Sequence, residues 1–169
     1  MSLFSNSFVF GFCINFVLIF LFCRVPLMTK GGWISAGILG SILWGCLLWQ
    51  GWISVVIYLL LGSIVTKIGY KFKRNKGIAE KRDGRRGPEN VWGSAATGLF
   101  FAIMIKLNFA NLLFYKIGFA ASFAAKLADT FGSEIGKRFG VNTYLITSLR
   151  KVDRGTEGGI SLELSLIHI

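Results

Sequence analysis

Two acidic side chains in the C-terminal half of the chain are placed where they could bind a metal ion and a nucleotide. Asp129 and Glu134 follow a hydrophobic segment, and hydroxyl and basic side chains surround them in the sequence. An acid this close to a hydrophobic segment is costly unless it faces protein or a ligand, which makes it a functional candidate. Carboxylates among basic groups are typical of nucleotide–metal sites. An interfacial ion pair between Asp129 and a lysine is the simpler alternative.

A helix over this region would sort its polar side chains onto two adjacent faces. One face would carry Lys126, Asp129 and Ser133, and the next Thr130, Glu134 and Lys137. Asp129 and Glu134 would then point about 140° apart around the helix axis. Joint ligation of one metal ion would therefore require a break near Gly132 or a bridging water.

Two further polar clusters adjoin or follow hydrophobic segments. Glu89 and Asn90 stand at the start of one such segment, directly after Pro88. Proline and an acidic residue both favour a helix start, so capping and ligand binding are equally open for this pair. The stretch 150–161, RKVDRGTEGGIS, places Arg154 and Thr156 among glycines, whose backbone N–H groups could cradle a phosphate. A flexible surface loop is the alternative there.

Other familiar sites do not occur in the sequence. The only histidine, His168, is near the end of the chain, which leaves no histidine-based triad or metal cluster. Neither a GxGxxG fingerprint nor a Walker A loop occurs, because residues 132–138 lack the spacing of that loop. The three cysteines have no metal-ligand spacing and predict no disulfide. An enzyme built on this chain would therefore use carboxylates and basic groups.

The elements that would position these groups are hydrophobic helices. Hydrophobic residues make up 53% of the 169 residues and charged ones only 16%, against about 25% in soluble domains. We predict an all-α, polytopic integral membrane bundle with about five transmembrane helices, in one domain over 1–162. The expected spans are 8–23, 33–49, 52–65, 91–105 and 110–125, with a turn at Gln50 and Gly51 between the second and third. A basic cytosolic-side loop, 67–90, and a C-terminal loop, 129–162, complete the expected domain.

The net charge of +11 comes from 19 lysines and arginines against 8 acids. Alternate threading of the spans puts all the basic loops on one side of the membrane, with the N-terminus on the other. The positive-inside rule explains this pattern, so nucleic acid is not an expected partner. Rows of small residues on the second span, such as Gly37, Ser41 and Gly45, would let helices pack closely.

Three motifs together resemble those of the phytyl-phosphate kinase family, which includes transmembrane protein 19 and bacterial members of unknown function. They are RGPENVWGS from Arg86, ADTFGSEIG from Ala128 and GTEGGIS from Gly155. The first is closest to the form in cyanobacterial and plastid-type members. More loosely, the chain is similar to dolichol kinases and CDP-diacylglycerol synthases, which use CTP with a divalent metal.

The resemblance implies a membrane prenyl-phosphate kinase that converts phytyl phosphate and a nucleoside triphosphate, with CTP expected, to phytyl diphosphate for tocopherol and phylloquinone synthesis. It implies Mg²⁺ or Mn²⁺, bound by Asp129 and Glu134 as catalytic residues. The groups expected to contact substrate or nucleotide phosphates are Lys126, Lys137, Arg154 and Thr156, with Glu89 and Asn90 at the mouth of the site. The expected location is a bacterial plasma membrane or a thylakoid membrane, among lipids, and homo-oligomerisation is left open.

The resemblance runs from Trp33 to Leu162 and then stops. Family members continue with further spans, whereas residues 163–169 resemble a translated adaptor, so we expect a C-terminally truncated member with a non-native tail. Two other functions remain open. One is a non-catalytic transporter or anionic-lipid-binding protein that uses the basic loop, and the other is a cytidylyltransferase that acts on a lipid phosphate.

Overall fold

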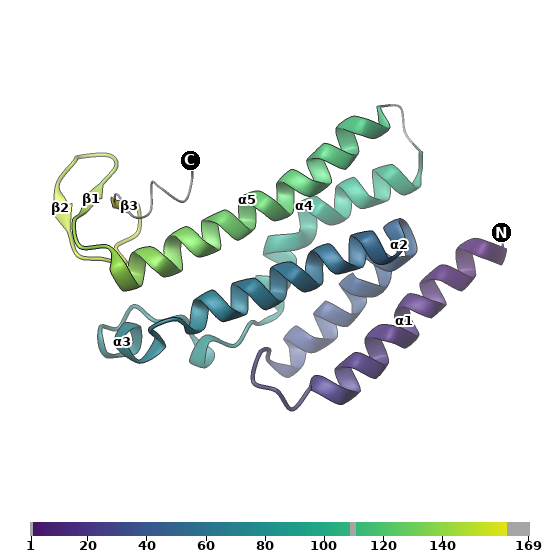
Figure 1. Ribbon diagram of the computed structural model, residues 1–169, viewed down its shortest axis with the longest axis horizontal. Helices are drawn as coiled ribbons and strands as arrows, with labels where there is room; N and C mark the ends of the chain where they lie inside the picture. Colours follow the sequence, from purple (N-terminus) through teal and green to yellow (C-terminus); the bar gives the residue numbers. More distant parts are fainter. Residues whose placement is uncertain (1, 109–110, 162–169) are drawn as a thin grey trace. The chain divides into compact units, whose positions relative to one another are not determined.

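The computed structural model describes residues 2–108 and 111–161, and Figure 1 shows its elements in chain order. The helices are α1 (Ser2–Phe22), α2 (Lys30–Lys67), α3 (Tyr70–Asn75), α4 (Pro88–Lys106) and α5 (Leu112–Phe139), with a 3₁₀ turn at Arg82–Gly84. The strands are β1 (Thr143–Leu145), β2 (Lys151–Val152) and β3 (Gly159–Ser161). The predicted helical class is confirmed. The first residue of the predicted fifth span, Ala110, and the predicted non-native tail with His168 lie outside the described residues.

The chain forms two compact units where one domain was expected. The first, which we call the apolar unit, comprises Met1–Leu59 and Arg85–Ala124. The second, the polar unit, comprises Leu60–Gly84 and Ala125–Ile169. Helices α2 and α5 contribute residues to both units.

Helix α2 contains the bend that separates the second and third predicted spans. Leu48, with φ 56° and ψ −146°, is the residue inside α2 that departs from helical geometry. The prediction of a turn at Gln50 and Gly51 is therefore wrong by two residues. Gly51 instead lies within the second half of the helix, where a Cβ would come within 2.7 Å of the Leu47 Cβ. The glycine is needed because the chain passes close to itself just after the bend.

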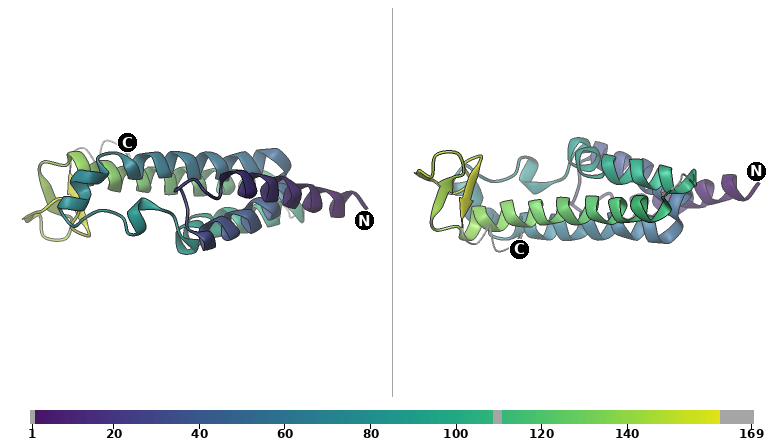
Figure 2. Two further views of the ribbon diagram at one scale, coloured as in Figure 1. Left: turned by 90° about the horizontal axis from the view of Figure 1, so that it is seen from below. Right: turned by 90° about the horizontal axis from the view of Figure 1, so that it is seen from above.

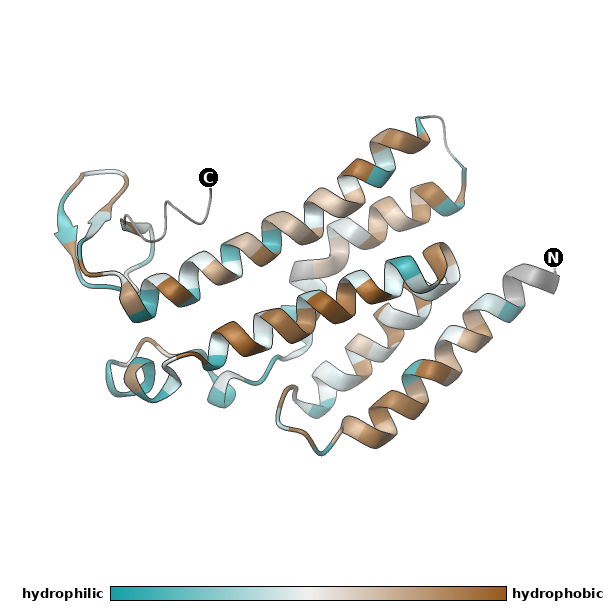
Figure 3. Ribbon diagram, viewed as in Figure 1, coloured by the Kyte–Doolittle hydropathy of each residue, from teal (hydrophilic) through white to brown (hydrophobic). Residues whose placement is uncertain are grey.

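The helices of the apolar unit have the hydrophobic surface expected in a bilayer, and one of them also has the length. Helix α2 is long and apolar enough to cross a membrane, and Asn6–Phe22 and Ala95–Lys106 are shorter apolar helices. On α1, the side chains of Phe12, Phe16 and Phe20 are 62%, 62% and 76% exposed. Figure 3 shows hydrophobic residues almost continuously along α1 and the second half of α2. A hydrophobic surface of this kind requires an apolar environment.

The predicted close packing of small residues occurs between α1 and the first half of α2. A Cβ on Gly37 would lie 2.6 Å from Ile19, and one on Gly40 would lie 2.5 Å from Asn15 Oδ1. The buried Asn15 Oδ1 accepts a hydrogen bond from Trp52 Nε1 at 3.1 Å, and its Nδ2 donates to the Gly11 carbonyl at 2.7 Å. Glycine therefore admits a polar side chain that links the two helices inside the hydrophobic layer.

The polar unit is more ordered than the two predicted loops. Helix α5 continues to Phe139, and the three strands pair antiparallel in the order β2-β1-β3. Figure 2 shows the strand region beyond the end of α5. The expected loop 129–162 is thus helical in its first part, and no proline interrupts the chain between Ala125 and Phe139. The expected loop 67–90 contains α3 and the 3₁₀ turn, and α4 begins at Pro88, which favours that position.

Candidate functional site

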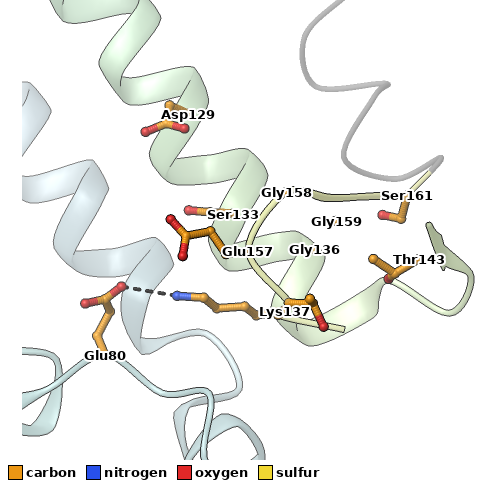
Figure 4. A pocket seen from close by; sticks show the side chains of 12 residues that line it. Glu80, Asp129, Ser133, Gly136, Lys137, Thr143, Glu157, Gly158, Gly159 and Ser161 are labelled. Carbon is orange, nitrogen blue, oxygen red and sulfur yellow. Dashed lines mark hydrogen bonds and ion pairs between the residues drawn. The ribbon is translucent and has the colours of Figure 1, made fainter. Parts of the chain in front are cut away.

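A cleft of about 620 Å³ lies within the polar unit, between the end of α5 and the strand region. Helix α5 contributes Asp129, Ser133, Gly136 and Lys137 to its wall. Figure 4 shows the first, second and fourth of these side chains following one another along the helix. They fall on one face because residues four apart on a helix are neighbours. The unbroken helix thus presents a carboxylate, a hydroxyl and an amine to one cavity.

The opposite wall comes from the glycine-rich turn before β3. Gly155 and Gly158 have φ angles of 83° and 75°, in the left-handed region that favours glycine. Gly159 packs against Thr143 of β1, where a Cβ would lie 2.7 Å from the threonine Cγ2. Thr156 and the exposed Glu157 lie between these glycines and also line the cleft. The turn therefore places a hydroxyl, a second carboxylate and backbone groups opposite α5.

The cleft is acidic although the chain is strongly basic. Glu80, Asp129 and Glu157 line it, against Lys137 as the one lysine or arginine among its described lining residues. Lys137 Nζ donates to Glu80 and to Glu134, each at 3.1 Å, so Glu80 already offsets its charge at the cleft. Asp129 pairs with Lys126, which is not a lining residue, and Glu157 is exposed in the cleft. A phosphate would meet these two carboxylates unfavourably unless a cation came with it. The chemistry of the wall therefore fits a divalent cation together with a phosphate ligand.

Lys137 remains a cation throughout the physiological pH range. Burial acts to lower the pKa of its amine, but attraction and hydrogen bonds from Glu134 and Glu80 outweigh burial, so the pKa rises above its ordinary value of 10.5. A positive amine at this position can bind phosphate if it leaves Glu80.

Glu134 does not line the cleft with Asp129, so the two acids do not face one cavity. It is buried, and its two oxygens accept hydrogen bonds from Lys73 and from Lys137. Lys73, on α3, is fully buried and also donates to the Thr66 carbonyl at 2.7 Å. Because α5 has no break near Gly132, Asp129 and Glu134 point in different directions. Glu134 positions Lys137, and it is not among the residues that line the cleft.

The other predicted site residues lie at different places. Lys126 pairs with Asp129 at 2.8 Å, the ion pair that was the simpler alternative for this acid. Arg154 lies over the Phe72 ring, 5.3 Å from its centroid, and donates to the Arg138 carbonyl at 3.2 Å. It therefore holds the glycine-rich turn in place.

Glu89 and Asn90 belong to the apolar unit, in the first turn of α4. The Asn90 side chain accepts a hydrogen bond from the Gly87 backbone N–H at 3.0 Å, which is a capping contact. Of the two interpretations left open for this residue, the structure supports capping. Glu89 is exposed beside it.

Three residues that matter to the site were not singled out in the sequence. Glu80 and Glu157 line the cleft, and Lys73 anchors Glu134. Glu157 could have been found as the acid inside the glycine-rich stretch. Glu80 and Lys73 stand among basic residues and carry no local signal, because their partners are 57 and 61 residues away.

Known proteins similar to this chain include two that are described as membrane proteins. Residues 13–166 match the family described as integral membrane protein DUF92. The chain is 50% identical over 141 residues to an uncharacterized membrane protein of Synechocystis sp., covering 83% of this chain and 55% of that protein. It is 40% identical over 160 residues to the chloroplastic protein VTE6 of Arabidopsis thaliana, covering 90% of this chain and 47% of that protein. It is 30% identical over 154 residues to an uncharacterized membrane protein of Methanocaldococcus jannaschii, covering 87% of this chain and 62% of that protein.

The chain thus spans about half the length of the curated relatives it matches. No solved structure matches it. The family match agrees with the hydrophobic surface of the apolar unit and confirms the predicted membrane location. This chain belongs to the DUF92 family of integral membrane proteins.

Proposed function

We propose that this chain provides the nucleotide site of a membrane prenyl-phosphate kinase, which transfers a phosphoryl group to phytyl phosphate or a related prenyl phosphate. The observation that carries the proposal is the acidic cleft in a membrane protein whose net charge is +11. Its volume is within the range of small-molecule sites. The resemblance of the ADTFGSEIG and GTEGGIS motifs to phytyl-phosphate kinases supports it, since these motifs form the two walls of the cleft.

The side chains of the cleft fit a magnesium ion that arrives with a nucleotide. Mg²⁺ is usually held by one or two carboxylates together with substrate phosphates. Asp129 and Glu157 supply two carboxylates, and Ser133 and Thr156 supply hydroxyls. Among the described residues, no three histidine, cysteine or acidic side chains gather to hold a metal ion on their own. We assign the metal to Asp129 and Glu157, with Mn²⁺ as a substitute, and Glu134 to the support of Lys137.

In the proposed reaction, a phosphate oxygen of the prenyl phosphate attacks the γ-phosphorus of the nucleoside triphosphate, with CTP expected. A new P–O bond forms, the bond from the γ-phosphorus to the β–γ bridging oxygen breaks, and nucleoside diphosphate leaves. Such transfers depend mainly on positioning and charge neutralisation. Bound Mg²⁺ would neutralise phosphate charge. Lys137 would exchange Glu80 for a phosphate oxygen, and the N–H groups of the glycine-rich turn would contact the phosphates.

The first test is Mg²⁺-dependent binding of nucleotides to the purified chain. We expect CTP to bind with Mg²⁺ and not with a chelator, and Asp129→Asn to weaken this binding about tenfold or more. Asp83→Asn is the matched control, because Asp83 is exposed, pairs with Arg74 and lies outside the cleft lining. Equal binding by the two variants, or no binding of CTP, ATP or GTP to the folded protein, would overturn the assignment of the cleft.

The reaction itself is tested by adding phytyl phosphate, CTP and Mg²⁺ to membranes that contain the protein. Phytyl diphosphate with CDP supports the kinase. A CMP-lipid with pyrophosphate would instead show the cytidylyltransferase reaction. Nucleotide binding without either product in a full-length relative would reject both transfers and favour a lipid-binding or transport role.

A further inference from the structure

Arg86 is a buried arginine in the apolar unit that has no acidic partner among the described residues of that unit. It is 8% exposed, its Nε has no hydrogen-bond partner, and it forms no ion pair with any described residue. Its guanidinium lies 5.6 Å from the centroid of the Tyr58 ring. The sequence of the apolar unit contains one acid, Glu89, which is exposed. An unpaired charge buried in a membrane protein is costly, and an anion bound at this position would offset that cost.

The backbone holds Arg86 in a fixed position. Its N–H donates to the Leu27 carbonyl and its carbonyl accepts from the Thr29 N–H, both at 3.0 Å. Met28 and Arg86 form an isolated parallel bridge. Gly32 packs directly on the Arg86 carbonyl, where no larger residue would fit. The main chain of Arg86 is therefore fixed before any ligand arrives, and the burial of the residue and the Tyr58 ring restrict its guanidinium, which reduces the entropy lost on binding.

A second unpartnered donor lies beside the same junction. Trp33 Nε1 is the other buried side-chain atom without a hydrogen-bond partner in the described part of the chain. The Trp33 backbone N–H donates to the Thr29 carbonyl, so Trp33 follows directly on the turn whose backbone pairs with that of Arg86. The first turns of α2 and α4 also meet here, since a Cβ on Gly31 would lie 2.9 Å from Pro88. Helix N-termini and N–H donors all favour a negatively charged ligand.

The depth of this junction identifies the kind of anion. Arg86 comes two residues before the start of α4, which is an apolar helix of an integral membrane protein. It therefore lies near the level of lipid headgroups, where phosphates are found. We propose that Arg86, with Trp33 and the starts of α2 and α4, binds the phosphate group of a lipid whose tail lies in the bilayer. A prenyl phosphate is one such lipid, but the proposal does not depend on nucleotide binding in the polar unit.

The test compares two adjacent arginines in the full 169-residue chain, purified in a neutral detergent. Dodecyl phosphate serves as the probe, with dodecanol and inorganic phosphate as the tail-only and headgroup-only controls. We expect dodecyl phosphate to bind the wild type and raise its unfolding temperature. Arg86→Met should weaken binding about tenfold or more, whereas the matched control Arg85→Met, at an exposed position, should not. Arg86→Lys should fall between them, because lysine keeps the charge and loses the planar fork.

Three results would overturn the proposal. Equal affinities of the Arg86→Met and Arg85→Met variants would mean that the basic surface binds the probe without a specific site. Inorganic phosphate as tight as dodecyl phosphate would indicate a site for a free anion. Unfolding of ligand-free Arg86→Met well below the wild-type temperature would mean that Arg86 is a structural residue. Binding of CTP and Mg²⁺ by Arg86→Met, measured on the same samples, separates this proposal from the proposed function, since that binding should not change.

Discussion

Lys73 of the polar unit and Arg86 of the apolar unit are both buried cations, but only Lys73 has a counterion among the described residues. Lys73 pairs with the equally buried Glu134, which also pairs with Lys137. Arg86 contacts the ring of Tyr58 and has no carboxylate partner in the part of the chain that the structure describes. A buried charge with an internal counterion stabilises the fold only as part of its pair, whereas one without a counterion is suited to a ligand. The difference separates a structural cation from a binding cation.

The largest expected effect is the removal of one partner from the internal pair. Lys73→Met leaves Glu134 buried with Lys137 as its remaining partner and should lower the free energy of unfolding by about 3–5 kcal/mol. The double variant Lys73→Met, Glu134→Gln should recover much of that loss, since no unpaired charge remains. Urea unfolding in detergent, followed by circular dichroism, measures both variants. The comparison breaks down if Lys73→Met is no more destabilising than Arg86→Met in lipid-free detergent.

A smaller effect is expected at a polar residue of the apolar unit that does have partners. Asn15→Leu removes the acceptor of Trp52 Nε1 and should cost about 1–2 kcal/mol of unfolding free energy. Ser54→Ala is a suitable control, because its hydroxyl bonds only to the Gln50 carbonyl in the same helix. Thermal unfolding in the same detergent compares the two. If Asn15→Leu unfolds at the same temperature as the wild type, the apolar unit tolerates unpartnered donors in general. That result would weaken the significance of Arg86.

The smallest effect concerns Glu80, the exposed member of the series of ion pairs that runs from Lys73 through Glu134 and Lys137. Because the pKa of Lys137 is raised, its pairs contribute stability that is fully present below pH 10.5 and lost as the pH rises through the raised pKa. Glu80→Gln should cost at most about 1 kcal/mol below that pH, since Glu80 is partly exposed and solvent screens the pair. The two unfolding curves should converge above the raised pKa. A difference that stays constant between pH 8 and pH 12 would contradict this account of the pKa shift.

The features that follow from local patterns could be predicted from the sequence. Uninterrupted hydrophobic runs predicted the helices, Pro88 marked the start of α4, and spacing alone grouped Asp129 with Ser133 on one face of α5. The unpredicted features join residues far apart in the chain. No local signal connects Lys73 to Glu134 or Glu80 to Lys137, since these pairings depend on how α3 and the segment after it lie against α5. The angle of about 140° between Asp129 and Glu134 follows from helix spacing alone, whereas the pairing of Glu134 with Lys73 does not.

The bend at Leu48 has a consequence for how the protein enters its membrane. Neither half of α2 can be seated in the bilayer until the corner between them has been carried across it, so insertion machinery must accept both halves as a pair. The corner itself contains Trp49, Gln50 and Gly51 and no charge. A lysine or arginine introduced there would have to be translocated with it, which opposes the charge bias that sets orientation. The neutral corner is thus a requirement of biogenesis as much as of the folded state.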